Sequence, residues 1–450
     1  MSEGLFDGVL AAGPVAELVA DRAWVQAMLD FAAALALASA AVGEIPAEAA
    51  AAIERCCHAE QYDIAELGTA AVGIGNPAGP LVRALTARVT PEAAAYVHLG
   101  ATSQDVLDTA AMLVTARALT ALRADLHACA DRLAQLAQEH AGTVLAGRSL
   151  LQQAPPVTFG LTAAGWLGGV VAALDRIDVL RQDRLAVQFG GAVGTLAALR
   201  GNGIPVLSEL AQRLGLAEPV LPWHTERSRI AEVAGVLGQT SGAVAKIARD
   251  VTLLAQTEIA EVSEQGPPGS GGSSTMPHKR NPVAAVLAAG SAAQAPGLVS
   301  TLLAAAAHEH QRAAGSWHAE WRPLNELLRS TGSAVHWLRV CLDRLQVDAQ
   351  RMRADLDRTG GQLLAEHVAM ELVSASHGAV GRQEAGDLVA ECCRRAEATE
   401  ADLADVLATT PGIAKFLSSK RISELLEPAG YLGSTQEFIQ RALVDRQSRL

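Results

Sequence analysis

The sequence predicts an all-α protein whose middle is a bundle of long helices. Half of its 450 residues are hydrophobic, only 3% are aromatic, and alanine is abundant. Alanine is the best helix former, whereas strands prefer β-branched and aromatic residues, so this composition favours packed helices over sheets. Long stretches with helical periodicity and few breaks point the same way.

The clearest predicted helix covers residues 228–262. Apolar residues and one threonine recur there at alternating steps of three and four, namely Ile230, Val233, Leu237, Thr240, Val244, Ile247, Val251 and Leu254. This spacing is typical of the seam of a bundle helix, and no proline interrupts it. A helix of this length would span roughly 50 Å, at about 1.5 Å per residue.

Three more long helices complete the predicted bundle. One runs from residue 108 to 140, one from the double proline at 155–156 to residue 187, and one from 282 to 308. Long helices joined in succession by loops are typical of an elongated bundle. Because such long seams need more partner surface than one chain offers, we expect an oligomer.

Shorter helical segments with more frequent breaks flank this bundle on both sides. We therefore expect three mostly helical domains, with boundaries at 1–105, 106–345 and 346–450. The central domain includes a Gly-, Pro- and Ser-rich loop at 266–283, where function is expected, since loops carried by a rigid scaffold often hold functional residues.

The charge and the cysteines exclude several classes of protein. The net charge of −12 disfavours binding to nucleic acid or to acidic membranes. No signal peptide and no uninterrupted apolar run of membrane-spanning length is apparent, so we expect a cytoplasmic protein that does not bind membranes. The six cysteines include two adjacent pairs and no C-x-x-C spacing, which predicts reduced thiols and no metal site.

The loop "GPPGSGGSSTMPHKRNPV" places two cations, Lys279 and Arg280, directly before a predicted helix. Helix starts favour negative charge, so the cations gain a purpose if they and the helix start hold an anion together. Pro282 suits the first helical turn, and a Gly/Ser hinge suits a lid that closes over a ligand. The loop lacks the Gly-Lys-Ser/Thr ending of a phosphate-binding P-loop.

Three other polar loops precede long helices. In "YVHLGATSQDVLDTA", Thr102 and Ser103 stand before a helix, with His98 nearby. Capping by Ser103 or Asp105 explains this stretch, and so does a carboxylate site at the helix N-terminus. The loops "AGRSLLQQAPPVTFG" and "PWHTERSR" are each also explained by an ordinary turn or cap.

The four loops together resemble those of the fumarase/aspartase superfamily. "HLGATSQD", the frame "GR…LQ.A.P.T.G", "HT.R.R" and "GSSTMPHKRNP" occur in the family's order and span most of the chain. The resemblance implies a helical homotetramer with a central twenty-helix bundle and active sites shared between subunits. Most members cleave a C–N or C–O bond beside a carboxylate and release fumarate.

The sequence looks most similar to the branch of this superfamily that closes a lactone on a muconate. "WHAEW", "PWHT" and "GNPAGPLV" carry this similarity. Adenylosuccinate lyases have histidines in place of Asn76 and Leu150 and an arginine in place of Trp321. Without the histidines, the groups expected to protonate a leaving amine are missing, and tryptophan cannot grip a phosphate as arginine does. A lactonising enzyme tolerates these losses, because the attacking group is the substrate's own carboxylate.

The resemblance also implies roles for individual residues. Ser273 would deliver the proton to carbon, with the neighbouring Ser274 as the alternative. The residues expected to bind a small polycarboxylate substrate are His98, Thr102, Ser103, Arg148, Gln152, Thr158, His278, Lys279, Asn281 and Arg312. Among them, Lys279 and Asn281 would hold carboxylates and stabilise an enolate-like intermediate, helped by Thr102, Ser103 and Thr158. No metal or organic cofactor is implied.

Two departures leave alternatives open. Relatives in this branch often have histidine at Gln153 and glutamine at Glu226, and a carboxylate is awkward in an anion pocket. Either Glu226 points away or the substrate differs. The alternatives are a β-elimination enzyme acting on adenylosuccinate or another succinyl compound, an enzyme for a related muconate, and a non-catalytic helical scaffold.

Overall fold

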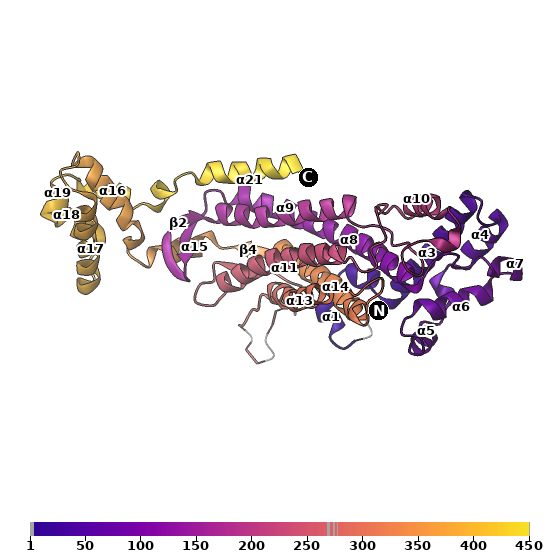
Figure 1. The fold of residues 1–450 in the computed structure, drawn as a ribbon. Helices are drawn as coiled ribbons and strands as arrows, with labels where there is room; N and C mark the ends of the chain where they lie inside the picture. Colours follow the sequence, from indigo (N-terminus) through magenta and orange to yellow (C-terminus); the bar gives the residue numbers. More distant parts are fainter. Residues whose placement is uncertain (1–3, 268–270, 273–274, 277, 450) are drawn as a thin grey trace. The chain divides into compact units, whose positions relative to one another are not determined.

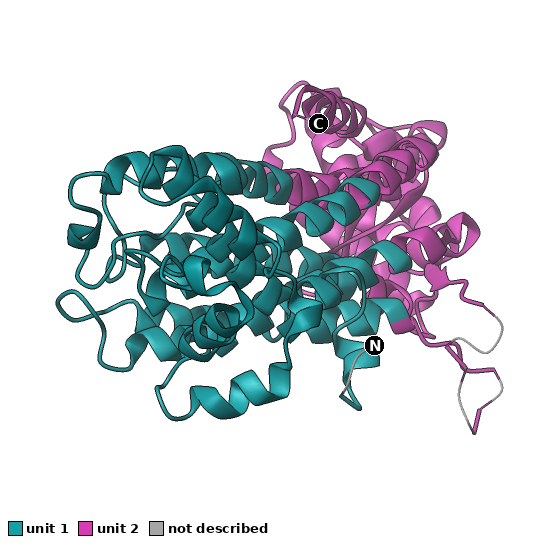
Figure 2. Cartoon of the chain, turned by 90° about the vertical axis from the view of Figure 1, so that its right-hand side faces the viewer, with its two compact units in different colours: residues 1–128, 172–249, 284–340 teal, residues 129–171, 250–283, 341–450 magenta. Residues whose placement is uncertain are grey.

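The computed structural model describes residues 4–267, 271–272, 275–276 and 278–449. Helices dominate these residues, and the strands among them are four short ones in two antiparallel pairs. The predicted all-α class is therefore confirmed (Figure 1). The chain divides into two compact units, shown in Figure 2. Unit 1 comprises residues 1–128, 172–249 and 284–340, and unit 2 comprises 129–171, 250–283 and 341–450. The three domain boundaries stay a prediction.

Four long helices run from one unit into the other along the sequence: α8 (Ser103–Glu139), α9 (Phe159–Asp183), α11 (Ser228–Leu254) and α14 (Ser316–Arg344). Side-chain bonds tie them together within unit 1. Arg123 on α8 is paired with Asp178 on α9, and the hydroxyls of Ser241 on α11 and Thr331 on α14 lie 3.0 Å apart. All eight residues of the predicted seam on α11 are buried, as the spacing predicts.

Shorter helices make up the rest of unit 1. They are α1 (Asp7–Leu10), α2 (Val15–Leu18), α3 (Asp21–Ala41), α4 (Ala47–Glu54), η1 (Ala59–Gln61), α5 (Ile64–Ala71), α6 (Ala78–Arg88), α7 (Pro91–Ala94), η2 (Ala197–Leu199), α10 (Gly203–Leu214), α12 (Val283–Ala292, with its first residue in unit 2) and α13 (Ala295–Ala305).

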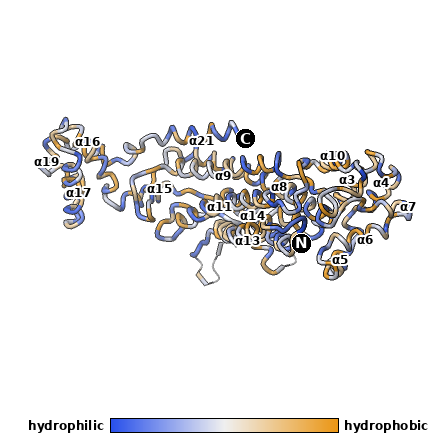
Figure 3. Tube along the Cα trace, in the orientation of Figure 1, coloured by the Kyte–Doolittle hydropathy of each residue, from blue (hydrophilic) through white to orange (hydrophobic). Residues whose placement is uncertain are grey.

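Unit 2 contains the strands and the C-terminal helices. Its further elements are β1 (Val144–Ser149), β2 (Gln152–Thr158), β3 (Val262–Glu264), β4 (Leu345–Val347), α15 (Ala349–Asp357), η3 (Gln362–Leu364), α16 (Ala365–Ala375), α17 (Arg382–Thr399), α18 (Leu403–Thr409), α19 (Pro411–Ala414), α20 (Ser419–Leu425), η4 (Pro428–Tyr431) and α21 (Thr435–Arg449). A separate apolar core, including Leu372, Val389 and Leu407, holds α16 to α20 together. Helix α21 is mostly hydrophilic (Figure 3) and buries few of its side chains.

Two predicted helix starts are wrong. Pro155 and Pro156 do not begin a helix but lie in β2, which pairs with β1, and α9 begins only at Phe159. A bulge between Ala146 and Gly147 accommodates the prolines, because a bulge leaves residues outside the ladder of hydrogen bonds. Helix α8 starts at Ser103, five residues before its predicted start.

Three other features of the helices differ from the prediction. Helix α11 ends at Leu254, and β3 follows it instead of more helix. The predicted helix over 282–308 is broken into α12 and α13, since Pro296 stands in the first turn of α13 and cannot continue a preceding helix. The long α14 was not predicted, because Pro323 within it weakens the helical pattern in the sequence.

Two helical stretches are long and apolar enough to cross a membrane by length and composition alone, 21–41 and 283–305. No apolar run of this length was expected from the sequence. Core helices of soluble proteins pass the same test, and ten residues of α3 are buried. All six cysteines are free.

Candidate active site

The first group of expected site residues lies in unit 1, in the turn that leads into α8. His98 and Gly100 both have a positive φ, of 62° and 74°, and the N–H of Ala101 donates to the carbonyl oxygen of His98 at 3.2 Å. Thr102 and Ser103 are half-buried, and among the described residues their hydroxyls have no hydrogen-bond partner. Their hydroxyls are therefore available to a ligand at the start of a 37-residue helix.

Asp105 is the residue that fixes this turn. Its carboxylate is fully buried and accepts the backbone N–H of Thr102 at 3.0 Å, as one half of a capping box does. Of the two capping candidates, Asp105 thus caps α8. The N–H groups of Gly190 and Gly191 and Nε2 of His224 bond to the same carboxylate, at 3.1, 2.9 and 2.6 Å. The loop after α9 and the turn before α8 are held together by this one side chain.

Arg312 lies beside the same helix start. Its Nη1 donates to Oε1 of Gln104 at 2.8 Å and its Nη2 to the carbonyl oxygen of Gly191 at 2.6 Å. Burial lowers the pKa of Arg312, and the nearby Asp105 and Asp108 oppose this effect. The structure therefore brings Arg312 together with the turn of Thr102 and Ser103, with part of its donor capacity used by protein oxygens.

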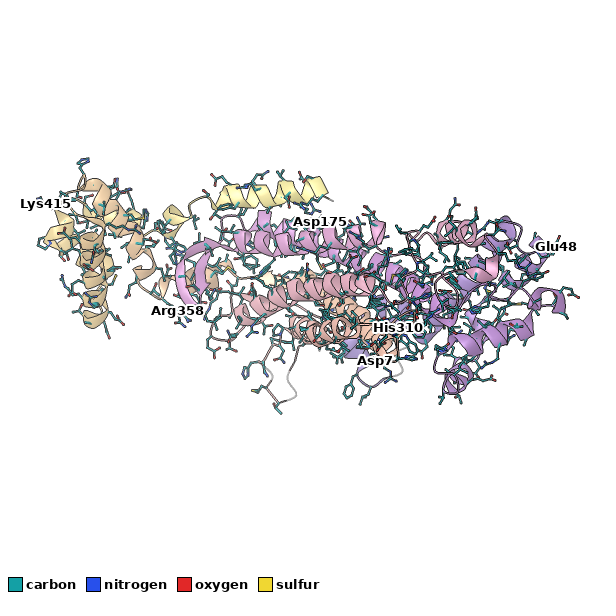
Figure 4. All side chains as sticks on the ribbon, in the orientation of Figure 1. Asp7, Glu48, Asp175, His310, Arg358 and Lys415 are labelled. Carbon is teal, nitrogen blue, oxygen red and sulfur yellow. The ribbon has the colours of Figure 1, made fainter. Side chains whose placement is uncertain are left out.

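The loop before α14, where Figure 4 labels His310, is fixed to the segment before α11. The Thr225 hydroxyl donates to the carbonyl oxygen of His310 at 2.9 Å. This loop carries Arg312, so the segment "PWHTERSR" acts in unit 1 by holding the loop that presents a predicted site residue.

A buried ionic group lies one turn further along α8. Arg227 donates to both oxygens of Asp108, at 2.8 and 3.1 Å, and to both oxygens of Glu320, at 3.0 and 2.6 Å. Burial alone would lower the pKa of Arg227, but the two carboxylates outweigh it and raise that pKa. The indole N–H of Trp317 also donates to Asp108. This group ties α8 and α14 to the residue directly before α11.

The second group of expected site residues lies in unit 2, on the hairpin of β1 and β2. Arg148 forms a two-point ion pair with Glu261, at 2.9 and 2.8 Å, and Glu261 is fully buried. Burial raises the pKa of Glu261, and Arg148 partly offsets this. Gln152 is exposed next to the hairpin tip, whereas the buried Thr158 hydroxyl accepts the N–H of Leu161 and caps α9.

The Gly-, Pro- and Ser-rich loop at 266–283 lies in unit 2 and is only partly among the described residues. Ser273 and Ser274, the predicted proton donors, lie outside the described residues. His278 and Lys279 are exposed, and Nδ2 of Asn281 donates to the carbonyl oxygen of Gly271 at 3.1 Å. Gly272 and Arg280 form an isolated antiparallel bridge, which closes the loop at its base. Lys279 and Arg280 stand before α12, which begins at Val283.

Glu226 turns back onto its own helix start. Its two carboxylate oxygens accept the backbone N–H and the hydroxyl of Ser228, at 3.1 and 2.8 Å. Glu226 thus forms an exposed local cap at the start of α11. Asn76 plays a similar local part, because its Oδ1 accepts the N–H of Gly79.

Trp321 stands on an apolar wall. Its ring packs edge to face on Trp317, with centroids 4.9 Å apart, and lies 4.6 Å from that of His318. With Trp24 and Met28 it lines a cavity of about 310 Å³ in unit 1. Trp321 itself offers no guanidinium to a phosphate. The same cavity is also lined by Asp108, Arg227, Glu320 and Arg322, so its lining is mixed.

Sequence reasoning missed the buried partners of the site residues. The sequence predicts Asp105 only as a helix cap, and it gives no role to Glu261. The signal for Asp105 was present in the "TSQD" spacing, which is that of a capping box with its acid three residues after the cap. Nothing local marks Glu261, since its partner Arg148 lies 113 residues away. Among the described residues, no group of three His, Cys, Asp or Glu could hold a metal ion.

A fold of long crosslinked helices, with polar loops at the helix starts, defines a helical lyase scaffold. The family model described as "Lyase" matches residues 11–297, and that described as "Adenylosuccinate lyase C-terminus" matches residues 361–442. The chain belongs to this lyase family, the fumarase/aspartase superfamily.

The individual relatives are similar over nearly the full length. The chain is 47% identical to the 3-carboxy-cis,cis-muconate cycloisomerase of Pseudomonas aeruginosa, over 99% of this chain and 96% of that protein. It is 44% identical to the crystal structure of the 3-carboxy-cis,cis-muconate lactonizing enzyme from Pseudomonas putida, with a TM-score of 0.93 and 99% of each chain covered. It is also 43% identical to the nitrosuccinate lyase of Streptomyces davaonensis, over 98% of this chain and 95% of that protein.

Proposed function

We propose that the chain is a cycloisomerase that converts 3-carboxy-cis,cis-muconate to 4-carboxymuconolactone by intramolecular lactonisation. The observation that carries this proposal is its similarity to proteins of that activity, at 47% identity over 99% of the chain. The reaction belongs to the protocatechuate branch of the β-ketoadipate pathway, in which bacteria degrade aromatic compounds.

In the proposed mechanism, one substrate carboxylate oxygen forms a C–O bond to a carbon of the conjugated double bond. The π electron pair of the attacked double bond passes into an enolate-like system, which then takes a proton on carbon from Ser273 or Ser274. Because the nucleophile belongs to the substrate, proximity lowers the barrier without an activated protein nucleophile. Lys279 and Asn281 supply the positive charge and the donor that stabilise the intermediate.

The remaining carboxylates are held by neutral donors and by cations. Thr102 and Ser103 stand at the start of α8, and their hydroxyls have no partner within the described part of the chain. This supports a role in carboxylate binding, since helix N-termini attract anions. His98 and Arg312 lie with them, while Arg148, Gln152, Thr158 and His278 complete the proposed substrate-binding set. Arg148 would act with its charge already balanced by Glu261.

The proposed working form is a cytoplasmic homotetramer whose active sites are shared between subunits. Support comes from the hairpin tip, where Leu150 and Leu151 are 96% and 72% exposed. Both have a positive φ, of 52° and 65°, in a turn that Asn-Gly would form with less strain. Burial against another subunit would explain why leucines occupy it.

A second candidate is β-elimination from a succinate derivative. The 43% identity to a nitrosuccinate lyase over nearly the full length supports it, because a relative at this level of identity is named as a lyase and not as a cycloisomerase. Leu150 argues against an amine leaving group, which needs a proton donor at that position.

One assay separates the two candidates. Purified protein without added metal should abolish the ultraviolet absorbance of the 3-carboxymuconate diene and leave adenylosuccinate and nitrosuccinate unchanged. If the diene signal persists with folded protein, the cycloisomerase proposal fails. Elimination from either succinate derivative, with the diene untouched, would support the second candidate.

A further inference from the structure

We infer that Asp105 is a positioning residue that sets the substrate-binding turn before α8, through a hydrogen-bonded network with Gly190, Gly191 and His224. The inference rests on the proposed function, in which Thr102 and Ser103 bind a substrate carboxylate. Asp105 itself does not contact substrate, since it is fully buried among protein donors.

Both oxygens of Asp105 are fully used. Oδ2 accepts the N–H of Thr102 at 3.0 Å and that of Gly191 at 2.9 Å, and Oδ1 accepts the N–H of Gly190 at 3.1 Å and Nε2 of His224 at 2.6 Å. Such a saturated carboxylate cannot shift without breaking several bonds in a dry interior, each costly to leave unmade. The position of Thr102 is therefore set by the loop at 190–191.

Gly191 connects the network back to the turn from the other side. It has a φ of 67°, and a Cβ atom added to it would lie 2.8 Å from the carbonyl oxygen of Gly100. Its own carbonyl oxygen accepts Nη2 of Arg312 at 2.6 Å. The loop thus packs directly on the backbone between His98 and Thr102, and it also holds Arg312.

Asp108 offers a matched comparison on the same helix. It is 3% exposed and accepts bonds from Arg227, Trp317 and Gln104, so it is as buried and as well bonded as Asp105. Its partners include no atom of the turn before α8. A change at Asp108 should cost stability without moving Thr102.

The first test compares Asp105→Asn with Asp108→Asn. In Asp105→Asn, an amide NH2 replaces one acceptor oxygen and meets N–H donors. We expect the KM for 3-carboxymuconate to rise at least about tenfold with kcat changed less than about threefold, because carboxylate binding is shared by ground and transition states. Asp108→Asn should keep KM within about threefold. Equal KM changes in both variants, or a wild-type KM in Asp105→Asn, would overturn the inference.

The second test does not touch the carboxylate and so avoids its folding cost. Gly191→Ala and Gly194→Ala both place alanine at a positive φ, of 67° and 87°, so the backbone strain is comparable. The new Cβ meets the Gly100 oxygen at 2.8 Å in the first, whereas its nearest contact in the second is Pro222 at 3.9 Å. Gly191→Ala should raise KM at least about tenfold and Gly194→Ala should not. The same rise in both would sink the inference.

Calorimetry with the unreactive tricarboxylate tricarballylate separates this inference from the proposed function. If the wild type turns over no diene, the proposed function fails, and the inference is decided on affinity alone. Tricarballylate should then bind at least about tenfold more weakly to Asp105→Asn and Gly191→Ala than to their matched controls. Equal affinities, or no binding by the wild type, would overturn it.

Discussion

Replacing Arg227 by glutamine should be among the most destabilising single changes in unit 1. The Arg227 side chain is 1% exposed, and the side chains of its partners Asp108 and Glu320 are 4% and 3% exposed. Glutamine would leave two carboxylates in a dry interior without their shared cation. Breaking a buried ion pair by removing one partner costs about 3–5 kcal/mol, since it leaves uncompensated charge.

The matched control is Arg353→Gln in unit 2. Arg353 also holds two carboxylates, those of Asp357 and Glu427, but all three side chains are about half exposed, at 47%, 54% and 50%. Solvent screens such pairs, which are typically worth about 0.2–1 kcal/mol. The two variants remove the same chemical group from the same number of carboxylate partners, and the two sites differ in burial.

The assay is urea denaturation followed by circular dichroism at one fixed protein concentration, because oligomer stability depends on concentration. The midpoint should fall clearly in Arg227→Gln and hardly in Arg353→Gln. Equal losses of stability in the two variants would refute the reasoning.

Three further predictions concern the site and the assembly. Ser273→Ala should lower kcat about 10²–10⁴-fold in the diene assay, which is the usual contribution of a general acid. Full activity of this variant would assign the proton transfer to Ser274 instead. Burial lowers the pKa of His98, so the unfolded chain binds a proton at a higher pH than the folded chain, and stability falls as pH drops below 6.5. His98→Gln should make the fall of Tm with decreasing pH less steep, and an unchanged dependence of Tm on pH would contradict this. Leu150→Asn with Leu151→Gly should weaken the proposed tetramer at least about tenfold in light scattering against concentration, because burying one leucine is worth about 1.5–3 kcal/mol. Unchanged association would contradict the proposed burial of this hairpin tip.

Much of the fold could be predicted because helical periodicity is a local signal. The seam on α11 from Ile230 to Leu254 is buried at all eight predicted positions. The errors lie where proline decides between two outcomes that look alike in sequence. Pro156 could begin a helix or sit beside a bulge in a strand, and the pairing of β1 with β2 favoured the strand.

The site could be predicted as a set of loops but not as a geometry. Thr102 and Arg312 stand 210 residues apart, yet both belong to the structure around the start of α8 through Gln104 and Gly191. Long-range pairs such as Arg148 with Glu261 leave no spacing in the sequence. The charge of Glu226 is awkward for an anion site, and its local bonds to Ser228 could not be predicted from the sequence.

The most direct test of the central claim is proton NMR of the product formed in D₂O. In the proposed reaction, the substrate's own carboxylate adds across one of its double bonds. The diene signals of 3-carboxymuconate should therefore disappear and give a lactone that carries one solvent deuteron on carbon, with no fumarate formed. Unchanged diene signals in the presence of folded protein would contradict the proposed lactonisation, as would fumarate released from adenylosuccinate.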